Sequence, residues 1–449
     1  MKIEVFGPIL EVLKKNKTMV LTTLGENPWS SRIYFASKGL DMYAIIEKSR
    51  NFHNIEKNPN VFFVIDSNTP DHFIQGEGVV EILGTPEERE KERALLFQKV
   101  VELIPFVKKV SNLVVIKIRP TRIFLSDFRT VFKPREEISV AEGDLKRALE
   151  MDKGVSKLRI YFNATRPFAF TATLISVLLG AFLAPNLNIP LLLLTLLGIL
   201  FIHAGVNALN DLMDYKYGVD DWLVLGASRV LQDKLLTEKE QILLIGTLLT
   251  LGSTIGVVLA FIRGFWILVI GLVGGILGIF YQIKPIGLKY RALGDFSVFL
   301  AFGPLLALGS YYVQTGTISY IPFIAAIPVG FLVIAILHGN NFRDLVEDVK
   351  CGYKTVASLL GVKGSSLYYA VIISLAYLLV LIFVLLKILP WQVLLTFFTL
   401  PIAYKNVRLA QRTDYLPFSL LDVFTAKLHL SFGILFTLGI IFSKISYGG

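Results

Sequence analysis

The chain has 449 residues, a formal net charge of +10 and 54% hydrophobic residues, and its mean hydropathy is +0.61. This hydropathy excludes an ordinary soluble protein, and the single cysteine excludes an internal disulfide and a thiolate cluster for zinc. The positive charge could indicate nucleic-acid binding, but the basic loops of a membrane protein explain most of the excess, so we expect no nucleic-acid partner.

Residues 1–130 are predicted to form a small soluble domain of short strands. Turn residues such as Gly25, Asn27 and Pro28 separate apolar runs, and Thr85 followed by acidic residues marks the start of a helix. This order predicts an antiparallel barrel with helical insertions. The expected strands are 18–24, 32–36, 41–46, 61–66, 73–83 and a final pair within 114–128, and the expected helix is 86–103.

Residues 131–160 are predicted to be a charged linker along the membrane surface, with a short helix over 141–151. Residues 161–449 are predicted to form an all-α bundle of about nine transmembrane helices, because apolar stretches of spanning length recur there. The stretches are 168–184, 189–209, 242–262, 265–282, 296–313, 321–338, 368–386, 390–404 and 428–442.

Lys and Arg concentrate in the loops that follow even-numbered stretches. Such residues accumulate on the cytoplasmic side of a membrane protein. We therefore expect a multi-pass protein of the cell membrane, with the amino-terminal domain in the cytoplasm and the carboxyl terminus outside.

Two acidic clusters follow apolar stretches in the membrane part. Asp211 and Asp214 stand three residues apart, and on a helix this spacing puts both carboxylates on one face. Asp344 and Asp348 stand four apart, with the same consequence. Ionisable side chains beside a membrane core are costly, so both pairs are candidate functional sites. Magnesium prefers one or two protein carboxylates, water and substrate phosphate oxygens. The pairs therefore indicate a diphosphate held between metal ions, with flanking asparagines at Asn207, Asn210 and Asn341.

The segments around these clusters read "NALNDLMDYKYGVDD" and "GNNFRDLVEDVKCGYKTVASLLG". They resemble the two signatures of the UbiA superfamily of intramembrane prenyltransferases. Within it, "GASRVLQDKLLT" and "YQIKPIGLKYRALGD" look most like 1,4-dihydroxy-2-naphthoate prenyltransferases of menaquinone synthesis. The resemblance implies a magnesium-dependent enzyme in which each Asp pair, with its asparagines, binds one metal ion. It also implies diphosphate-binding residues in the neighbouring loops: Tyr281, Lys284, Lys289, Arg291, Arg343 and Lys354.

The amino-terminal domain resembles the pyridoxamine 5'-phosphate oxidase-like split barrel, which binds FMN. The matching stretches include "MVLTTLGENPWSSRIYF" and "KSRNFHNIEKNPNVFFVI". The resemblance implies a flavin phosphate site at Ser49 and Arg50, with Arg32 nearby. Asn51 stands where many flavin-binding members have a second basic residue. A barrel without cofactor that serves as a docking or stability module is the alternative.

The expected function is transfer of a polyprenyl group from polyprenyl diphosphate to an aromatic acceptor. Three alternatives stay open from the sequence. The acceptor could be geranylgeranylglyceryl phosphate, which gives an ether lipid. The protein could be a membrane-anchored flavin-dependent quinone reductase. It could also be a secondary transporter, although the Asp pairs lie at loops and no repeated half is recognisable.

Overall fold

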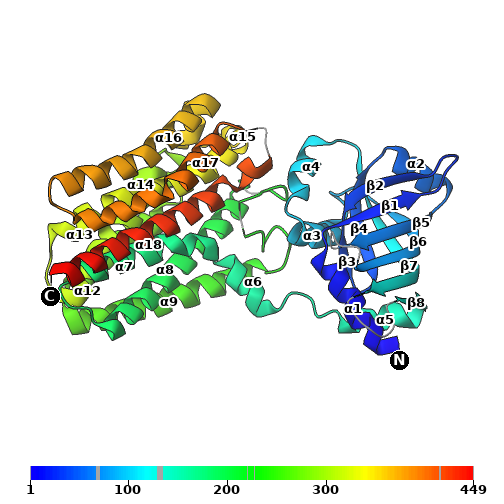
Figure 1. Cartoon of the computed structure of the whole chain (residues 1–449), viewed down its shortest axis with the longest axis horizontal. Helices are drawn as coiled ribbons and strands as arrows, with labels where there is room; N and C mark the ends of the chain where they lie inside the picture. The colour runs from blue at the N-terminus through cyan, green and yellow to red at the C-terminus, as the bar shows by residue number, and fades with distance from the viewer. Residues whose placement is uncertain are drawn as a thin grey trace. The chain divides into compact units, whose positions relative to one another are not determined.

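The computed structural model describes residues 2–66, 71–128, 135–219, 221–226, 228–413 and 416–447. The chain divides into two compact units (Figure 1). The first comprises Met1–Ile160 with Trp222–Leu225 and Gln232–Leu235. The second comprises Tyr161–Asp221, Gly226–Leu231 and Leu236–Gly449.

The first unit is built on an eight-stranded antiparallel sheet, which confirms the predicted β domain. The strand order is β2-β1-β5-β6-β7-β4-β3, and β8 pairs with β7. Side chains alternate between the two faces of a strand, and in β1 Met19, Leu21 and Thr23 are buried. The strands are β1 (Thr18–Thr23), β2 (Trp29–Tyr34), β3 (Ala36–Lys38), β4 (Asp41–Glu47), β5 (Asn60–Asp66), β6 (His72–Gly84), β7 (Leu113–Asp127) and β8 (Arg135–Ser139).

Five helices accompany this sheet. They are α1 (Lys2–Lys15), α2 (Arg50–Lys57), α3 (Glu90–Lys99), α4 (Leu103–Lys109) and α5 (Glu142–Met151). The sequence did not predict α1, although Phe6, Ile9 and Leu13 recur at helical spacing and are buried in the core. The helix expected over 86–103 is shorter and ends at Lys99, and α4 follows it.

The prediction of a linker over 131–160 is wrong for much of that segment. Residues 135–139 form β8 and pair with β7 from Arg122↔Ser139 to Ser126↔Arg135. Beyond the predicted short helix α5, the Asp152 carboxylate accepts a hydrogen bond from the Gly39 backbone at 2.7 Å. Polar composition hid this strand, because Ile138 is its one buried residue. Residues 131–134 lie outside the described residues.

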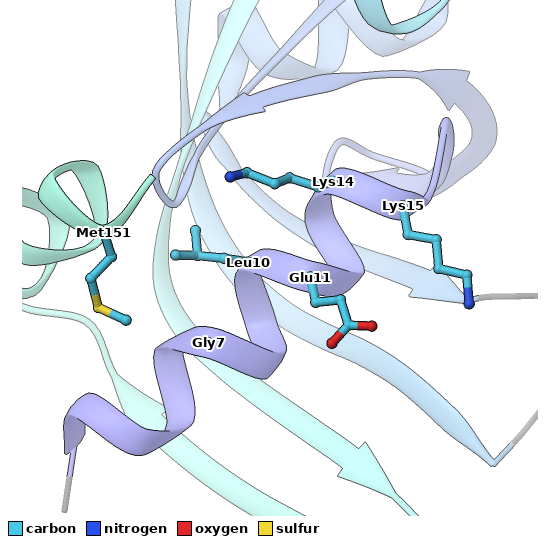
Figure 2. A pocket seen from close by; sticks show the side chains of 6 residues that line it. All are labelled: Gly7, Leu10, Glu11, Lys14, Lys15 and Met151. Carbon is cyan, nitrogen blue, oxygen red and sulfur yellow. The ribbon is translucent and has the colours of Figure 1, made fainter. Parts of the chain in front are cut away.

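A hollow of about 590 Å³ lies on the first unit between α1 and the end of α5 (Figure 2). Gly7, Leu10, Glu11, Lys14, Lys15 and Met151 line it. Its lysine Lys14 pairs with Asp152 at 2.6 Å. None of the six lining residues is one that the sequence predicts as functional.

The second unit is helical. Its helices are α6 (Lys157–Ala164), which begins in the first unit, η1 (Pro167–Ala169), α7 (Phe170–Leu183), α8 (Ile189–Lys216), α9 (Glu238–Arg263), α10 (Trp266–Phe280), η2 (Leu288–Tyr290), α11 (Gly294–Leu300), η3 (Ala301–Leu305), α12 (Leu306–Thr315), α13 (Tyr320–Ala325), α14 (Ile327–Arg343), α15 (Leu345–Lys350), α16 (Val356–Leu385), η4 (Trp391–Thr399), α17 (Leu400–Ala410), η5 (Leu416–Leu420) and α18 (Leu421–Tyr447).

The multi-span helical bundle is confirmed, but the count of about nine spans is not. Among the described residues, six helical segments are long and apolar enough to cross a membrane, or seven if the bent pair 157–164 and 167–183 forms one span. Helix α10 has 15 residues, about 22 Å at 1.5 Å per residue, which is shorter than a bilayer core of about 30 Å. The stretch expected over 390–404 folds as η4 followed by α17.

Helix α14 packs against α16, α18 and α11 in the interior of the bundle. Glycine allows one close approach there, since a Cβ atom on Gly303 would lie 2.9 Å from Cα of Gly330. The second acidic cluster begins at the other end of this helix, after Arg343.

Candidate active site

The first acidic cluster lies at the end of α8. The helix starts at Asn188, whose side chain accepts the Leu191 N–H, and continues past the apolar stretch to Lys216. Asp211 and Asp214 are both buried. One oxygen of Asp211, Oδ2, accepts the Ser228 N–H at 3.1 Å, and the other lies in an ion pair with Arg166.

Asp214 is held by two groups from the segment that follows α10. Lys289 Nζ lies 2.5 Å from Oδ1 and 2.7 Å from Oδ2, and Tyr290 donates its hydroxyl proton to Oδ1 at 2.9 Å. Lys289 also donates to Asn210 Oδ1 at 2.6 Å. A carboxylate with charge-assisted partners on both oxygens is fixed in orientation.

The second acidic cluster begins where α14 ends. Arg343 donates to both oxygens of Asp344, at 2.9 and 2.7 Å. The same guanidinium donates to Asp422 at 2.9 Å and to Asn340 at 2.6 Å. Arg343 is thus a buried, fully engaged cation between α14 and α18. A Cβ atom on Gly226 would lie 1.7 Å from Arg343 Nη2, so a side chain there would require the guanidinium to move.

Asp348 lies on α15, where its Oδ2 accepts the Thr355 hydroxyl at 3.3 Å. Burial and the neighbouring charge of Asp344 raise the pKa of Asp348 to about 7. The positive charge of Lys289 lowers this pKa, and the negative charge of Asp214 raises it. The structure therefore brings the two acidic clusters, distant in the sequence, around one site.

Two loops meet beside this site. The backbone N–H of Ala292 donates to the Lys354 carbonyl at 2.5 Å, and Arg291 and Lys354 form a parallel bridge. The side chains of Lys284, Arg291 and Lys354 belong to exposed residues, and Arg291 donates to the Pro285 carbonyl at 2.7 Å. Tyr281 lies nearer the acidic pairs, with its ring 5.9 Å from Lys289 Nζ.

The asparagines differ in their surroundings. Asn210 shares Lys289 with Asp214, whereas Asn207 donates to the Thr165 carbonyl at 2.9 Å. Asn341 is half-buried on α14. The asparagine that contacts Arg343 is Asn340, which the sequence analysis did not select.

Hard oxygen donors in each pair fit magnesium. Among the described residues, however, no three His, Cys, Asp or Glu side chains group closely enough to hold a metal ion by themselves. Magnesium takes one or two protein carboxylates and completes its shell with water and substrate oxygens. Asp211 and Asp214 could hold one ion in this way, and Asp344 and Asp348 the other.

Sequence reasoning missed several side chains at the site. Arg166, Tyr290 and Thr355 contact Asp211, Asp214 and Asp348 in turn. Asn340 and Asp422 accept hydrogen bonds from Arg343, which binds Asp344. One signal was present, because Asp422 is an acidic residue beside the apolar stretch 428–442 and qualifies by the same rule as the two pairs. Nothing local points to Arg166 or Asn340.

The predicted flavin residues do not gather on one face of the sheet. The Arg50 guanidinium lies over the Trp29 ring at 4.7 Å, whereas Arg32 stands three residues from Trp29 on β2 and therefore points to the opposite face, where it donates to Thr18. Asn51 is buried and bonded to Thr23 and Ser31. Ser49 is exposed at the start of α2. These residues do not fit the expected phosphate site, so we derive no step through a flavin.

The fold and site define a class: a multi-pass membrane protein with paired carboxylates and cations at the ends of its helices. The chain belongs to the UbiA prenyltransferase family, whose pattern residues 173–428 match. It is therefore a membrane prenyltransferase. Residues 8–127 match the pyridoxamine 5'-phosphate oxidase family, which identifies the amino-terminal domain as one of that kind.

Known proteins are similar to each of the two parts of the chain. UbiA prenyltransferase domain-containing protein 1 of Danio rerio is 32% identical over 292 residues, which cover 64% of this chain and 85% of the relative. A solved structure described as digeranylgeranylglyceryl phosphate synthase is 19% identical, covers 64% of this chain and 99% of its own, and has a TM-score of 0.44. A putative pyridoxamine 5'-phosphate oxidase from Listeria innocua is 25% identical over 27% of this chain and 97% of its own, with a TM-score of 0.23.

Proposed function

We propose that the protein transfers a polyprenyl group from polyprenyl diphosphate to an aromatic acceptor of the 1,4-dihydroxy-2-naphthoate type, in quinone synthesis. The observation that supports this most is the pairing of each acidic cluster with a cation: Lys289 lies within 2.7 Å of both oxygens of Asp214, and Arg343 donates to both oxygens of Asp344. A site with this density of acidic and basic groups suits a diphosphate with its counter-ions.

Ionisation of the allylic diphosphate is the demanding step. The C–O bond breaks, the diphosphate leaves with the electron pair, and the prenyl cation remains. Cations near the leaving oxygens lower the cost of the developing negative charge. We assign this role to four basic residues of the converging loops, Lys284, Lys289, Arg291 and Lys354, and to the charge of Arg343 at the end of α14. Tyr281 would orient the diphosphate.

Magnesium, when bound at the two Asp pairs, would neutralise diphosphate oxygens as a Lewis acid. Neighbouring residues of the protein hold the carboxylates of the two Asp pairs in place for such a metal ion. Lys289 forms an ion pair with Asp214, and Arg343 forms one with Asp344. Tyr290 and Ser228 fix the orientation of Asp214 and Asp211.

The acceptor then supplies an electron-rich ring carbon, which forms the new C–C bond with the prenyl cation. A ring proton, or the ring carboxylate as carbon dioxide, leaves to restore aromaticity. The naphthoate type is favoured by the motifs "YQIKPIGLKYRALGD" and "NNFRDLVEDVKCGYKTVA".

We also infer that both acidic clusters face the cytoplasm, because the Lys and Arg excess lies in the same loops. The amino-terminal domain would then be cytoplasmic and the carboxyl terminus outside.

The test is product formation by the purified full-length protein in detergent. It receives geranylgeranyl diphosphate, magnesium and either dihydroxynaphthoate or geranylgeranylglyceryl phosphate, and products are identified by mass. We expect a prenylated naphthoquinone precursor that requires magnesium. Asp211→Asn and Asp344→Asn should each lower kcat by on the order of 100-fold or more, whereas Glu347→Gln, on α15 beside Asp348, should not. An ether-lipid product would show that the acceptor is geranylgeranylglyceryl phosphate and not dihydroxynaphthoate. The absence of a product with both acceptors would contradict the proposal.

A further inference from the structure

Lys284 lies among three tyrosine rings. Its Nζ is 4.4 Å from the ring centroid of Tyr217, 5.2 Å from that of Tyr353 and 5.6 Å from that of Tyr290. The rings also contact one another, with centroids 6.3 Å apart for Tyr217 and Tyr290 and 4.4 Å apart for Tyr290 and Tyr353. We call these three side chains the tyrosine cage.

The charge of Lys284 is not neutralised by a carboxylate within the described part of the chain. Its polar side-chain contact is the Tyr353 hydroxyl, at 3.4 Å. Lys289 and Arg343 differ in this respect, because they pair with Asp214 and with Asp344 and Asp422. An ammonium held on aromatic faces keeps its full positive charge and loses part of its hydration. Lys284 is therefore available to an anion.

The cage adjoins the site. Tyr217 directly follows α8, the helix of Asp211 and Asp214. Tyr290 donates to Asp214, so one wall of the cage is bonded to the first acidic pair. Tyr353 accompanies the second pair, since its backbone N–H donates to the Asp348 carbonyl at 2.9 Å. The three walls thus come from segments that carry or contact the two clusters.

We propose that Tyr217, Tyr290 and Tyr353 are positioning residues, which hold Lys284 as the cation that receives an anionic group of a substrate. That group is either the diphosphate of the prenyl donor or the ring carboxylate of the acceptor. This inference rests on the proposed function and adds the cage to it. Lys284 itself touches the anion, whereas the tyrosines act through Lys284.

The test uses the full-length protein and separates the ring from the hydroxyl. Lys284→Met should raise KM for one substrate roughly tenfold. Tyr217→Leu and Tyr353→Leu should each raise the same KM several-fold, in line with a cation–π contribution of about 1 kcal/mol. Tyr217→Phe and Tyr353→Phe, which keep the ring, should preserve it. Lys427, which lies 5.5 Å from the single ring of Phe424, provides the control Lys427→Met, with KM unchanged.

The substrate whose KM rises identifies the anion as diphosphate or carboxylate. Unchanged KM values for both substrates in Lys284→Met would overturn the proposal, as would equal effects of the Leu and Phe variants. If the wild-type protein gives no product with either acceptor, the proposed function fails separately. In that case calorimetry tests the cage by measuring the binding of inorganic pyrophosphate and of dihydroxynaphthoate. The cage predicts that Lys284→Met weakens the binding of one of these two ligands roughly tenfold. Equal binding by the variant and the wild type would refute it.

Discussion

The hydroxyl of Tyr290 donates a hydrogen bond to Oδ1 of Asp214 over 2.9 Å. Burial, together with the negative charge of Asp214, raises the pKa of Tyr290 above its usual range, so the hydroxyl stays protonated. The loop after α10 thereby controls the orientation of a carboxylate on α8.

This bond can be removed while the ring is kept. Tyr290→Phe should lower kcat by roughly 10- to 100-fold, since a hydrogen bond to a charged group contributes about 1.5–3 kcal/mol. It should leave the KM of the substrate bound by Lys284 unchanged. Steady-state kinetics checks both values, with Tyr311→Phe on α12 as the control. Unaltered kcat in Tyr290→Phe would show that Lys289 alone orients Asp214.

Gly226 is predicted to be essential for the position of Arg343. In Gly226→Ala the new methyl group must displace a guanidinium bonded to Asp344, Asp422 and Asn340. We expect a strong loss of activity and a lower melting temperature in detergent. Gly256→Ala on α9, where a Cβ meets nothing within 4 Å, should retain both. Equal behaviour of the two variants would argue against a fixed Arg343.

The first unit should become more stable as the pH rises above neutrality. Burial lowers the pKa of Lys99 from 10.5 to about 7, and this effect outweighs the contacts of its ammonium with the Phe35 ring and the Leu13 carbonyl. Between these values the unfolded chain binds a proton that the folded domain lacks, so the free energy of unfolding increases with pH in that window.

The measurement compares wild type with Lys99→Met by hydrogen exchange of strand peptides in the full-length protein between pH 7 and 10. The ratio of the two exchange rates cancels the intrinsic pH dependence. Protection in the wild type should approach that of Lys99→Met as the pH rises. The exposed neighbour Lys91→Met should follow the wild type. A constant ratio would mean that Lys99 stays charged in the folded state.

Cys351 provides a natural probe of membrane orientation. It is an exposed cysteine just after α15. If the acidic clusters face the cytoplasm, a membrane-impermeant maleimide should label it in inside-out vesicles and not in intact cells. Ile318→Cys, placed before α13 in a Cys351→Ser background, should show the reverse pattern. Labelling of Cys351 from outside would invert the proposed topology.

The sequence by itself determined the division into a β domain and a helical membrane bundle, and it located both acidic pairs. These features are local: the length of an apolar run and the spacing of two carboxylates are written in consecutive residues. The contacts of the carboxylates are not local. Arg343 meets Asp422 across 79 positions, and Lys289 meets Asp214 across 75.

The tertiary structure also determines features that the local sequence does not indicate. The strand Arg135–Ser139 has too few apolar residues to stand out, and its pairing with β7 defines it. Arg32 and Arg50 seemed to belong to one site, but the alternation of side chains on β2 separates Arg32 from the face that Arg50 contacts. The tyrosine cage arises only when three segments pack together, because aromatic faces surround a cation through geometry that sequence spacing does not encode.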